Sequence, residues 1–142
     1  MVVKQLAIFL ENKGGRLSEI TGILAKAGIN ISALSIADTS EYGILRLIVS
    51  DPEKALIALK REHISVHLSE VVCMSIANQP GSLARALKIL SEGGISVEYM
   101  YAFAMGEQGF VVIKPDDNQV CLDTLRKHEA DLFAPLEGPN KY

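Results

Sequence analysis

Two short segments of the chain combine residue types that suit the binding of a small anion. Asn12-Lys13-Gly14-Gly15-Arg16-Leu17 and Asn78-Gln79-Pro80-Gly81-Ser82-Leu83 each follow a short apolar run and precede a stretch with helical spacing. The first N–H groups of a helix have no intrahelical partner, and the helix dipole adds partial positive charge there. Such a site suits a carboxylate, and glycine lets it approach the backbone. Alternatively, the asparagines cap the helices and the glycines permit the turns.

The two segments are equivalent positions of an internal repeat. When the sequence is shifted by 66 residues, Asn12 falls on Asn78, Gly15 on Gly81, and Gly28-Ile29 on Gly94-Ile95. The matches fall on glycines and on apolar positions typical of a core, which indicates that both halves keep one fold. A fold constraint would recur as readily as a binding site, so the repeat alone leaves both interpretations open.

Each half is predicted to fold as βαββαβ. Residues 16–27 have apolar side chains at helical spacing and end at Gly28, and Asp51-Pro52 starts a second helix. The equivalent helices are expected at 82–93 and 117–129. Strands are expected at 5–10, 29–38, 44–50, 64–68, 71–77, 97–105, 110–114 and 130–134. The fold class is therefore α+β: two tandem ferredoxin-like units, each a four-stranded antiparallel sheet with two helices on one face.

The boundary between the two predicted domains, 1–69 and 70–142, falls in Leu68-Ser69-Glu70-Val71, which has no room for a flexible tether. A unit of about 70 residues buries only ~60% of its unfolded surface and is marginal alone. We therefore expect the two units to pack together.

Composition excludes several classes of protein. Of the 142 residues 49% are hydrophobic, which argues against disorder, and the net charge of -3 disfavours nucleic acid and anionic membrane as partners. No apolar run reaches the ~18 residues of a membrane span, and the start lacks a signal-peptide pattern. Cys73 and Cys121 follow no metal-ligand spacing. We expect no metal, no cofactor and a cytoplasmic setting.

The predicted strands do not alternate cleanly between apolar and polar residues. Tyr99, Tyr101 and Phe103 recur at period two, with Met100 and Ala102 between them. Since a sheet covered by helices on one side should alternate, we expect the open sheet face to pack on a second copy as a homodimer. Scattered surface apolar residues are the alternative.

The two glycine loops, with the tetrads Gly28-Ile29-Asn30-Ile31 and Gly94-Ile95-Ser96-Val97 that follow each first helix, resemble the ACT domain family. The resemblance covers both halves. It implies a non-catalytic regulatory module that binds an amino acid between paired domains, which often lie side by side as an eight-stranded sheet. A regulated enzyme is then a further partner.

The resemblance also implies which residues contact the ligand, namely the loop of one domain and the second strand of its neighbour. The implied residues are Asn12, Gly14, Gly15, Leu17, Asn30, Ile31, Ser32, Asn78, Pro80, Gly81, Leu83, Ser96, Val97 and Glu98. Gly14 stands where the second loop has Pro80, and Ala33, Ser35 and Ala37 stand where the second half has aromatic residues. The two sites are therefore not equivalent, and one is a candidate for a degenerate site.

Two other functions remain open from the sequence. An assembly subunit without a ligand would use the apolar sheet face. A small hydrolase of the acylphosphatase type would rest on Arg16 in the first loop, but fold alone does not give function. His63 and His67 flank a strand without completing a metal site, His128 is expected on a helix surface, and both cysteines are expected in the core because they align with Ala7 and Ala55.

Overall fold

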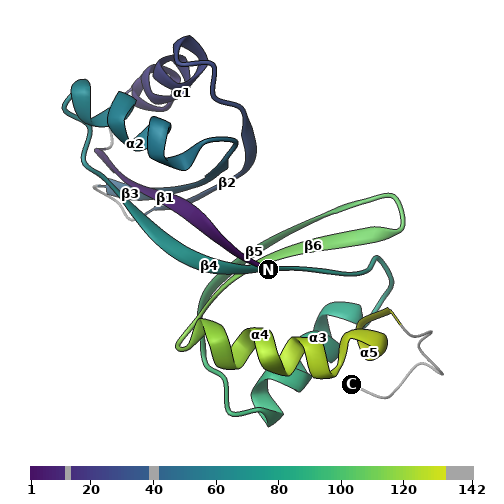
Figure 1. Ribbon diagram of the computed structural model, residues 1–142. Helices are drawn as coiled ribbons and strands as arrows, with labels where there is room; N and C mark the ends of the chain where they lie inside the picture. Colours follow the sequence, from purple (N-terminus) through teal and green to yellow (C-terminus); the bar gives the residue numbers. More distant parts are fainter. Residues whose placement is uncertain (12–13, 39–41, 134–142) are drawn as a thin grey trace. The chain divides into compact units, whose positions relative to one another are not determined.

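The computed structural model describes residues 1–11, 14–38 and 42–133 (Figure 1). Its elements are β1 (Val2–Glu11), α1 (Arg16–Lys26), β2 (Ile31–Asp38), β3 (Tyr42–Val49), α2 (Pro52–Arg61), β4 (Val66–Ala77), α3 (Ser82–Glu92), β5 (Val97–Met105), β6 (Gln108–Pro115), α4 (Asn118–Lys127) and α5 (Glu129–Phe133). The α+β class and the predicted helices are thereby confirmed, apart from helix bounds that shift by one or two residues.

The described strands hydrogen-bond in the order β2-β3-β1-β4-β6-β5, so they number six rather than the expected eight. The strands predicted at 64–68 and 71–77 are one continuous strand, β4, because no glycine or proline interrupts Val66–Ala77. The chain divides into two compact units. The first unit is Lys4–Glu70, and the second is Met1–Val3 with Val71–Tyr142. Both β1 and β4 therefore contribute residues to both units.

In the first unit, β1 pairs with β3 and β3 with β2, both antiparallel. Helices α1 and α2 lie against one face of these strands (Figure 1). The core between them contains Leu6, Ile20, Leu24, Leu47 and Leu59, all fully buried.

The second unit repeats this arrangement, with β6 between β4 and β5 and with α3 and α4 on one face. The strand predicted at 130–134 is wrong, because residues 129–133 form helix α5. Leu132 of α5 is 5% exposed and joins the core of this unit. Beside β4 lies the start of the chain, where the N–H of Cys73 donates a 2.8 Å hydrogen bond to the carbonyl oxygen of Met1.

Three helices end in the same hydrogen-bonded motif. After α1, α2 and α3, an isoleucine N–H donates back to a leucine carbonyl: Ile29 to Leu24, Ile64 to Leu59 and Ile95 to Leu90. This Schellman motif needs a left-handed residue just before the isoleucine. Gly28 (φ 71°) and Gly94 (φ 75°) serve α1 and α3, whereas α2 uses His63 at φ 58°.

Candidate functional site

The first loop ends in a glycine that starts α1. Gly15 is the N-cap residue at φ 82°, a left-handed conformation that favours glycine, and as a glycine it supplies no side-chain cap. A Cβ atom placed on Gly14 or Gly15 would meet no heavy atom within 4 Å. Leu17, in the first turn, is 37% exposed. Asn12 lies outside the described residues.

The second loop also ends in a left-handed glycine that starts a helix. Gly81 is the N-cap of α3 at φ 86°, again without a side-chain cap. Pro80 is exposed, and Leu83 packs against the core. Asn78 does not cap the helix: its side-chain Nδ2 donates to the carbonyl oxygen of Gly106 at 2.9 Å. The interpretation of this asparagine as a helix cap is therefore wrong, and its side chain instead fixes the loop to the β5–β6 turn.

A glycine N-cap leaves the first-turn N–H groups without a side-chain acceptor. Ordinary N-caps such as Asp51, whose carboxylate accepts from the N–H of Lys54 at 3.1 Å, satisfy one of these donors. At Gly15 and Gly81 the N-cap residue itself takes up none of these donors. After Gly81 the N–H of Ser82 already donates to the carbonyl oxygen of Gln79 at 3.1 Å, so an anion there would bind the N–H groups that follow it. At the first loop Arg16 adds another donor, because its buried Nε has no hydrogen-bond partner while its Nη1 binds the Glu19 carboxylate at 2.9 Å.

The predicted residues on β2 and β5 lie at the other end of each unit. The N–H of Asn30 donates to Ser50 Oγ at 3.0 Å, and the equivalent N–H of Ser96 donates to Asp116 Oδ1 at 3.2 Å. The register shifts between Ile31 and Ala33 and between Val97 and Tyr99. Ser32 and Glu98 therefore occupy irregular positions of the kind that often adjoin functional sites.

Within one unit the loop and these strand residues are not brought together. Along β2, Ile31 pairs with Val49, whereas Asp38 pairs with Gly43 near the end of β1. The seven residue steps from Ile31 to Asp38 span about 23 Å. A ligand of amino-acid size held by a loop therefore needs a different domain to supply the second-strand contacts.

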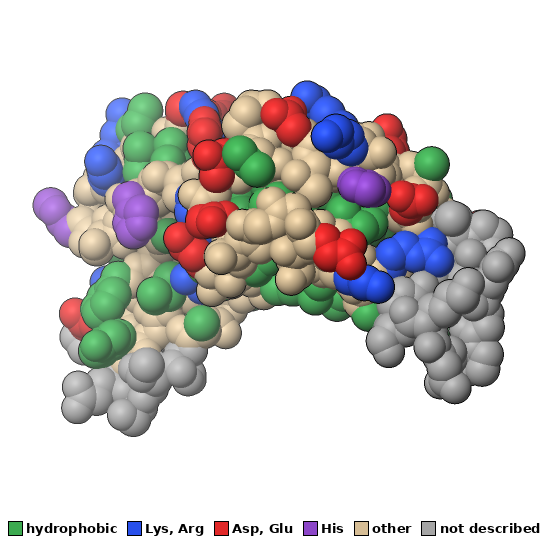
Figure 2. All heavy atoms as spheres, turned by 90° about the horizontal axis from the view of Figure 1, so that it is seen from below, with side chains coloured by type: hydrophobic (Ala, Val, Ile, Leu, Met, Phe, Trp, Pro, Cys, Tyr) green, Lys and Arg blue, Asp and Glu red, His purple; other side chains and the backbone are tan. Residues whose placement is uncertain are grey.

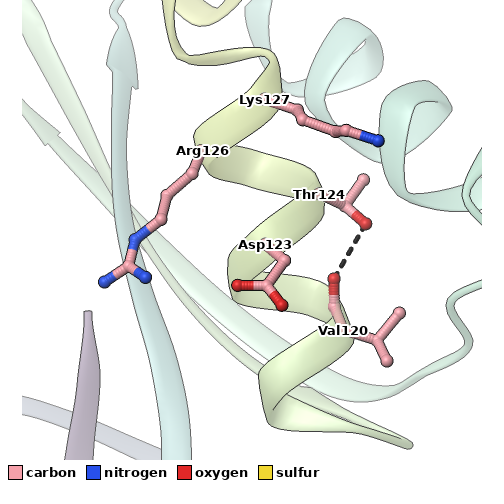
Figure 3. A pocket seen from close by; sticks show the side chains of 5 residues that line it. All are labelled: Val120, Asp123, Thr124, Arg126 and Lys127. Carbon is pink, nitrogen blue, oxygen red and sulfur yellow. Dashed lines mark hydrogen bonds between the residues drawn. The ribbon is translucent and has the colours of Figure 1, made fainter.

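Two surface concavities of the described residues lie away from the predicted residues. One, on α4, is lined by Val120, Asp123, Thr124, Arg126 and Lys127 (Figure 3). The Thr124 hydroxyl that lines this concavity already has a partner within the helix, because its Oγ1 donates to the carbonyl oxygen of Val120 at 2.8 Å. Another lies between α1 and α2, beside Gly22 and Ala58. Neither is lined by a residue that the sequence predicted to bind a ligand.

Both cysteine thiols have a raised pKa. Burial raises the pKa of the Cys121 thiol to about 11 and raises that of Cys73 as well. Cys121 lies in the core as expected, but Cys73 is only partly buried and pairs with Val112 rather than joining the core. His128 Nδ1 lies 3.1 Å from the Asp131 carboxylate at the end of α4.

Three broader properties of the described residues concern metals, surface charge and membranes. No group of three or more His, Cys, Asp and Glu side chains in this part of the chain is placed to hold a metal. Acidic and basic side chains are interspersed over the face in Figure 2, without the single-sign field that steers a polyanion. None of the described helices is long and apolar enough to cross a membrane.

A family model, the ACT domain pair, matches residues 1–134 of this chain. The chain belongs to the ACT domain pair family. The resemblance seen in the two loops is thereby confirmed.

Solved structures of several other proteins have a similar fold. A protein from Bacteroides thetaiotaomicron is 51% identical, with a TM-score of 0.88 over 91% of this chain and 90% of that one. The ligand-free regulatory subunit of aspartate kinase from Thermus thermophilus is 16% identical, with a TM-score of 0.66 over 89% and 96% of the chains. E. coli aspartokinase III, solved with lysine and aspartate, is 15% identical, with a TM-score of 0.55 over 94% of this chain and 32% of that one. No curated protein matches the chain.

Some residues that shape the loops of this ACT pair were not anticipated from the sequence. The Gly106 carbonyl holds the Asn78 side chain, and the Glu107 carbonyl accepts from the Asn78 N–H at 2.9 Å. The antiparallel pairing of β4 with β6 could have indicated this contact. It places Ala77 opposite Gln108, and hence the loop after β4 beside the β5–β6 turn.

Proposed function

We propose that this ACT pair is a non-catalytic regulatory protein that binds an amino acid, with the ligand carboxylate at a glycine N-cap. The observation that carries the proposal is the pair of left-handed glycines, Gly15 and Gly81, which start α1 and α3 without a side-chain cap. These helix starts present N–H donors and partial positive charge to an anion.

The second-strand residues complete the proposed site from another ACT domain. The proposal keeps the residues at each strand start, Asn30, Ile31 and Ser32 with Ser96, Val97 and Glu98. Because one unit holds its loop and its strand start about 23 Å apart, the neighbouring domain supplies these contacts. The predicted domains, 1–69 and 70–142, and the cytoplasmic setting are kept in the proposal.

The first loop is the stronger candidate of the two. It offers the buried, unpaired Nε of Arg16 beside Gly15, whereas the equivalent residue of the second loop is Ser82. An arginine donor and a helix start together favour a carboxylate. Structural relatives include a regulatory subunit of aspartate kinase, which supports amino acids as the ligand class and an enzyme as the regulated partner.

A thermal-shift screen of the twenty amino acids tests the proposal. A ligand at a hundred times its Kd adds about 2.7 kcal/mol of stability, which raises Tm by roughly 5–10 °C. Gly15→Asp should abolish the shift at the first loop by placing a carboxylate where the ligand binds. Gly15→Asn, of the same shape but neutral, is the matched control, since both side chains tolerate positive φ and meet open space.

The absence of a shift with all twenty amino acids at millimolar concentration would contradict amino-acid sensing. A shift that survives Gly15→Asp and the equivalent Gly81→Asp would contradict the assigned loops while keeping the ligand class.

A ligand-free assembly subunit is the second candidate, and the exposed apolar sheet face favours it. Phe9 is 47% and Phe103 45% exposed. We propose a homodimer through this face in either case. Capture of an enzyme partner that is unaffected by amino acids would favour assembly over sensing. The hydrolase alternative loses ground because Glu19 occupies Arg16 Nη1, leaving the guanidinium a poorer clamp for a phosphoryl group.

A further inference from the structure

Each unit has one sheet face that its helices do not cover, which we call the open face. At equivalent positions of the two open faces, one unit has large side chains and the other has small ones. In the second unit Tyr99, Tyr101 and Phe103 of β5 form what we call the ridge. In the first unit Ala33, Ser35 and Ala37 of β2, each 66 residues earlier, form what we call the strip. Large side chains thus stand in one unit where small ones stand in the other.

The strand register places both sets on the face turned away from the helices. Tyr101 pairs with Val112, whereas the neighbouring Val111 and Ile113 belong to the core. Likewise Ser35 pairs with Arg46, between the core residues Leu45 and Leu47. Directly paired residues share a face and successive residues alternate. The ridge and the strip are therefore both on open faces.

Several aromatic side chains toward the ends of these faces remain in contact with solvent, whereas Val112, which pairs with Tyr101, is buried. Phe103 is 45% exposed although its ring stacks on Phe110 at a centroid distance of 5.2 Å. On the first unit, Phe9 and Tyr42 form a ring pair at 4.8 Å and are 47% and 45% exposed. Contiguous apolar surface of this kind marks an interaction site.

We infer that a second copy of this chain covers these faces, with the ridge of each copy packed into the strip of the other. The pairing rests on the proposed homodimer and adds which residues meet. A two-fold axis makes such an interface self-complementary, because ridge on strip is matched by strip on ridge.

Packing distances favour this pairing over ridge on ridge. Two sheets pack face to face at about 10 Å, and side chains on one face of a strand recur about every 6.7 Å. Aromatic rings directly opposed to aromatic rings would hold the sheets farther apart. Rings opposed to Ala33, Ser35 and Ala37 fill the gap, as large residues against small ones do in well-packed cores.

The available area fits a second copy. Three strands of eight residues, as in the first unit, present a face of roughly 26 Å by 14 Å, or about 370 Å². A reciprocal dimer uses one such face from each unit and covers about 740 Å² per copy, close to the ~800 Å² of a stable complex. A partner seated on one face alone would cover half of that.

The polar groups are also compatible. Arg46 lies beside the strip and the tyrosine rings lie along the ridge. A guanidinium over an aromatic face is favourable, more so when water is excluded. Ridge on strip brings these two together, whereas ridge on ridge would instead place Lys114, which pairs with Tyr99, near the opposing rings.

Charge-swap variants test the pairing by size-exclusion chromatography with light scattering. Ser35→Glu and Tyr101→Lys should each weaken the dimer about 30-fold or more, because each buries an unpaired charge. An equimolar mixture should dimerise again: the mixed dimer has one Glu–Lys contact and one native contact. Ile57→Lys, at an exposed position on α2 (54% exposed), is the matched control and should remain dimeric.

Each outcome has a distinct meaning. A monomeric wild-type protein overturns the homodimer and the pairing together, without touching amino-acid binding in the thermal screen. Dimers that tolerate both single variants, or monomers that mixing does not rescue, overturn the pairing alone. Rescue of Tyr101→Lys by Tyr101→Glu would establish ridge on ridge instead. If circular dichroism shows that Tyr101→Lys is unfolded, Phe103→Lys takes its place.

Discussion

The side-chain amide of Asn78 lies 2.9 Å from the carbonyl oxygen of Gly106 and donates a hydrogen bond to it. Together with the bond from its N–H to Glu107, this contact fastens the loop before α3 to the β5–β6 turn. Asn78 therefore holds the loop before Gly81 in place, although its side chain does not cap α3.

Asn78→Ala should lower the free energy of unfolding by about 1 kcal/mol, the net value of one hydrogen bond. Asn78→Asp should lower it further at pH 7, because a carboxylate would face the Gly106 carbonyl. Urea titration measures both. Asn30→Ala is the control, since the backbone of Asn30, not its side chain, makes the bond to Ser50. An equal loss of stability in Asn78→Ala and Asn30→Ala would contradict a stabilising role of the Asn78 side-chain bond.

His63→Gly should stabilise the protein by roughly 0.5–1 kcal/mol. His63 is the one non-glycine residue with positive φ in the described part of the chain, and it ends α2 where glycines end α1 and α3. Relief of left-handed strain outweighs the added entropy of glycine in the unfolded chain. His67→Gly, within β4, should lower the free energy of unfolding. If both substitutions changed this free energy in the same direction, backbone strain at His63 would be contradicted.

Stability should fall above pH 9 in a way that depends on Cys121. Burial raises the pKa of this thiol in the folded protein from its ordinary value of 9.0 to about 11. Between these values the unfolded chain binds fewer protons than the folded one. The stabilisation is thus complete below pH 9 and is lost as the pH rises toward 11. Urea titrations from pH 8 to 11 should show a shallower decline in Cys121→Ala; identical slopes would count against the shift.

Leu132→Ala should destabilise the protein by about 2–3 kcal/mol, as expected for a buried leucine. Leu132 is 5% exposed in the core of the second unit, while the adjacent Phe133 is 44% exposed. Phe133→Ala should therefore change the urea midpoint little. Equal effects would mean that α5 does not pack as described.

The helices and the paired glycine loops followed from local signals. Helical spacing of apolar residues, Asp51 before Pro52 and the glycines after α1 and α3 each act within a few residues, and all reappear in the structure. The turns at Gly15 and Gly81 followed from the same kind of signal, because a strand must turn sharply into a helix there. The structure adds that both glycines have positive φ.

The last strand could not be predicted because strand pairing is not local. The repeat placed a fourth strand at 130–134 by analogy with residues 64–68. The place beside β4 is taken by Met1, about seventy residues away along the sequence. Residues 129–133 then fold as a helix that buries Leu132. The partner of Asn78 was missed for the same reason, since it lies on another turn.

Because β1 and β4 each lend residues to both units, the duplicated sequence has ceased to be two interchangeable copies. A fragment that begins at Val71 would leave the backbone of Cys73 without its Met1 partner. A fragment that stops at Glu70 would truncate β4 in its middle. A protein cut or recombined between its halves would therefore have damaged sheets, and the part of this chain that keeps its sheets whole is the pair.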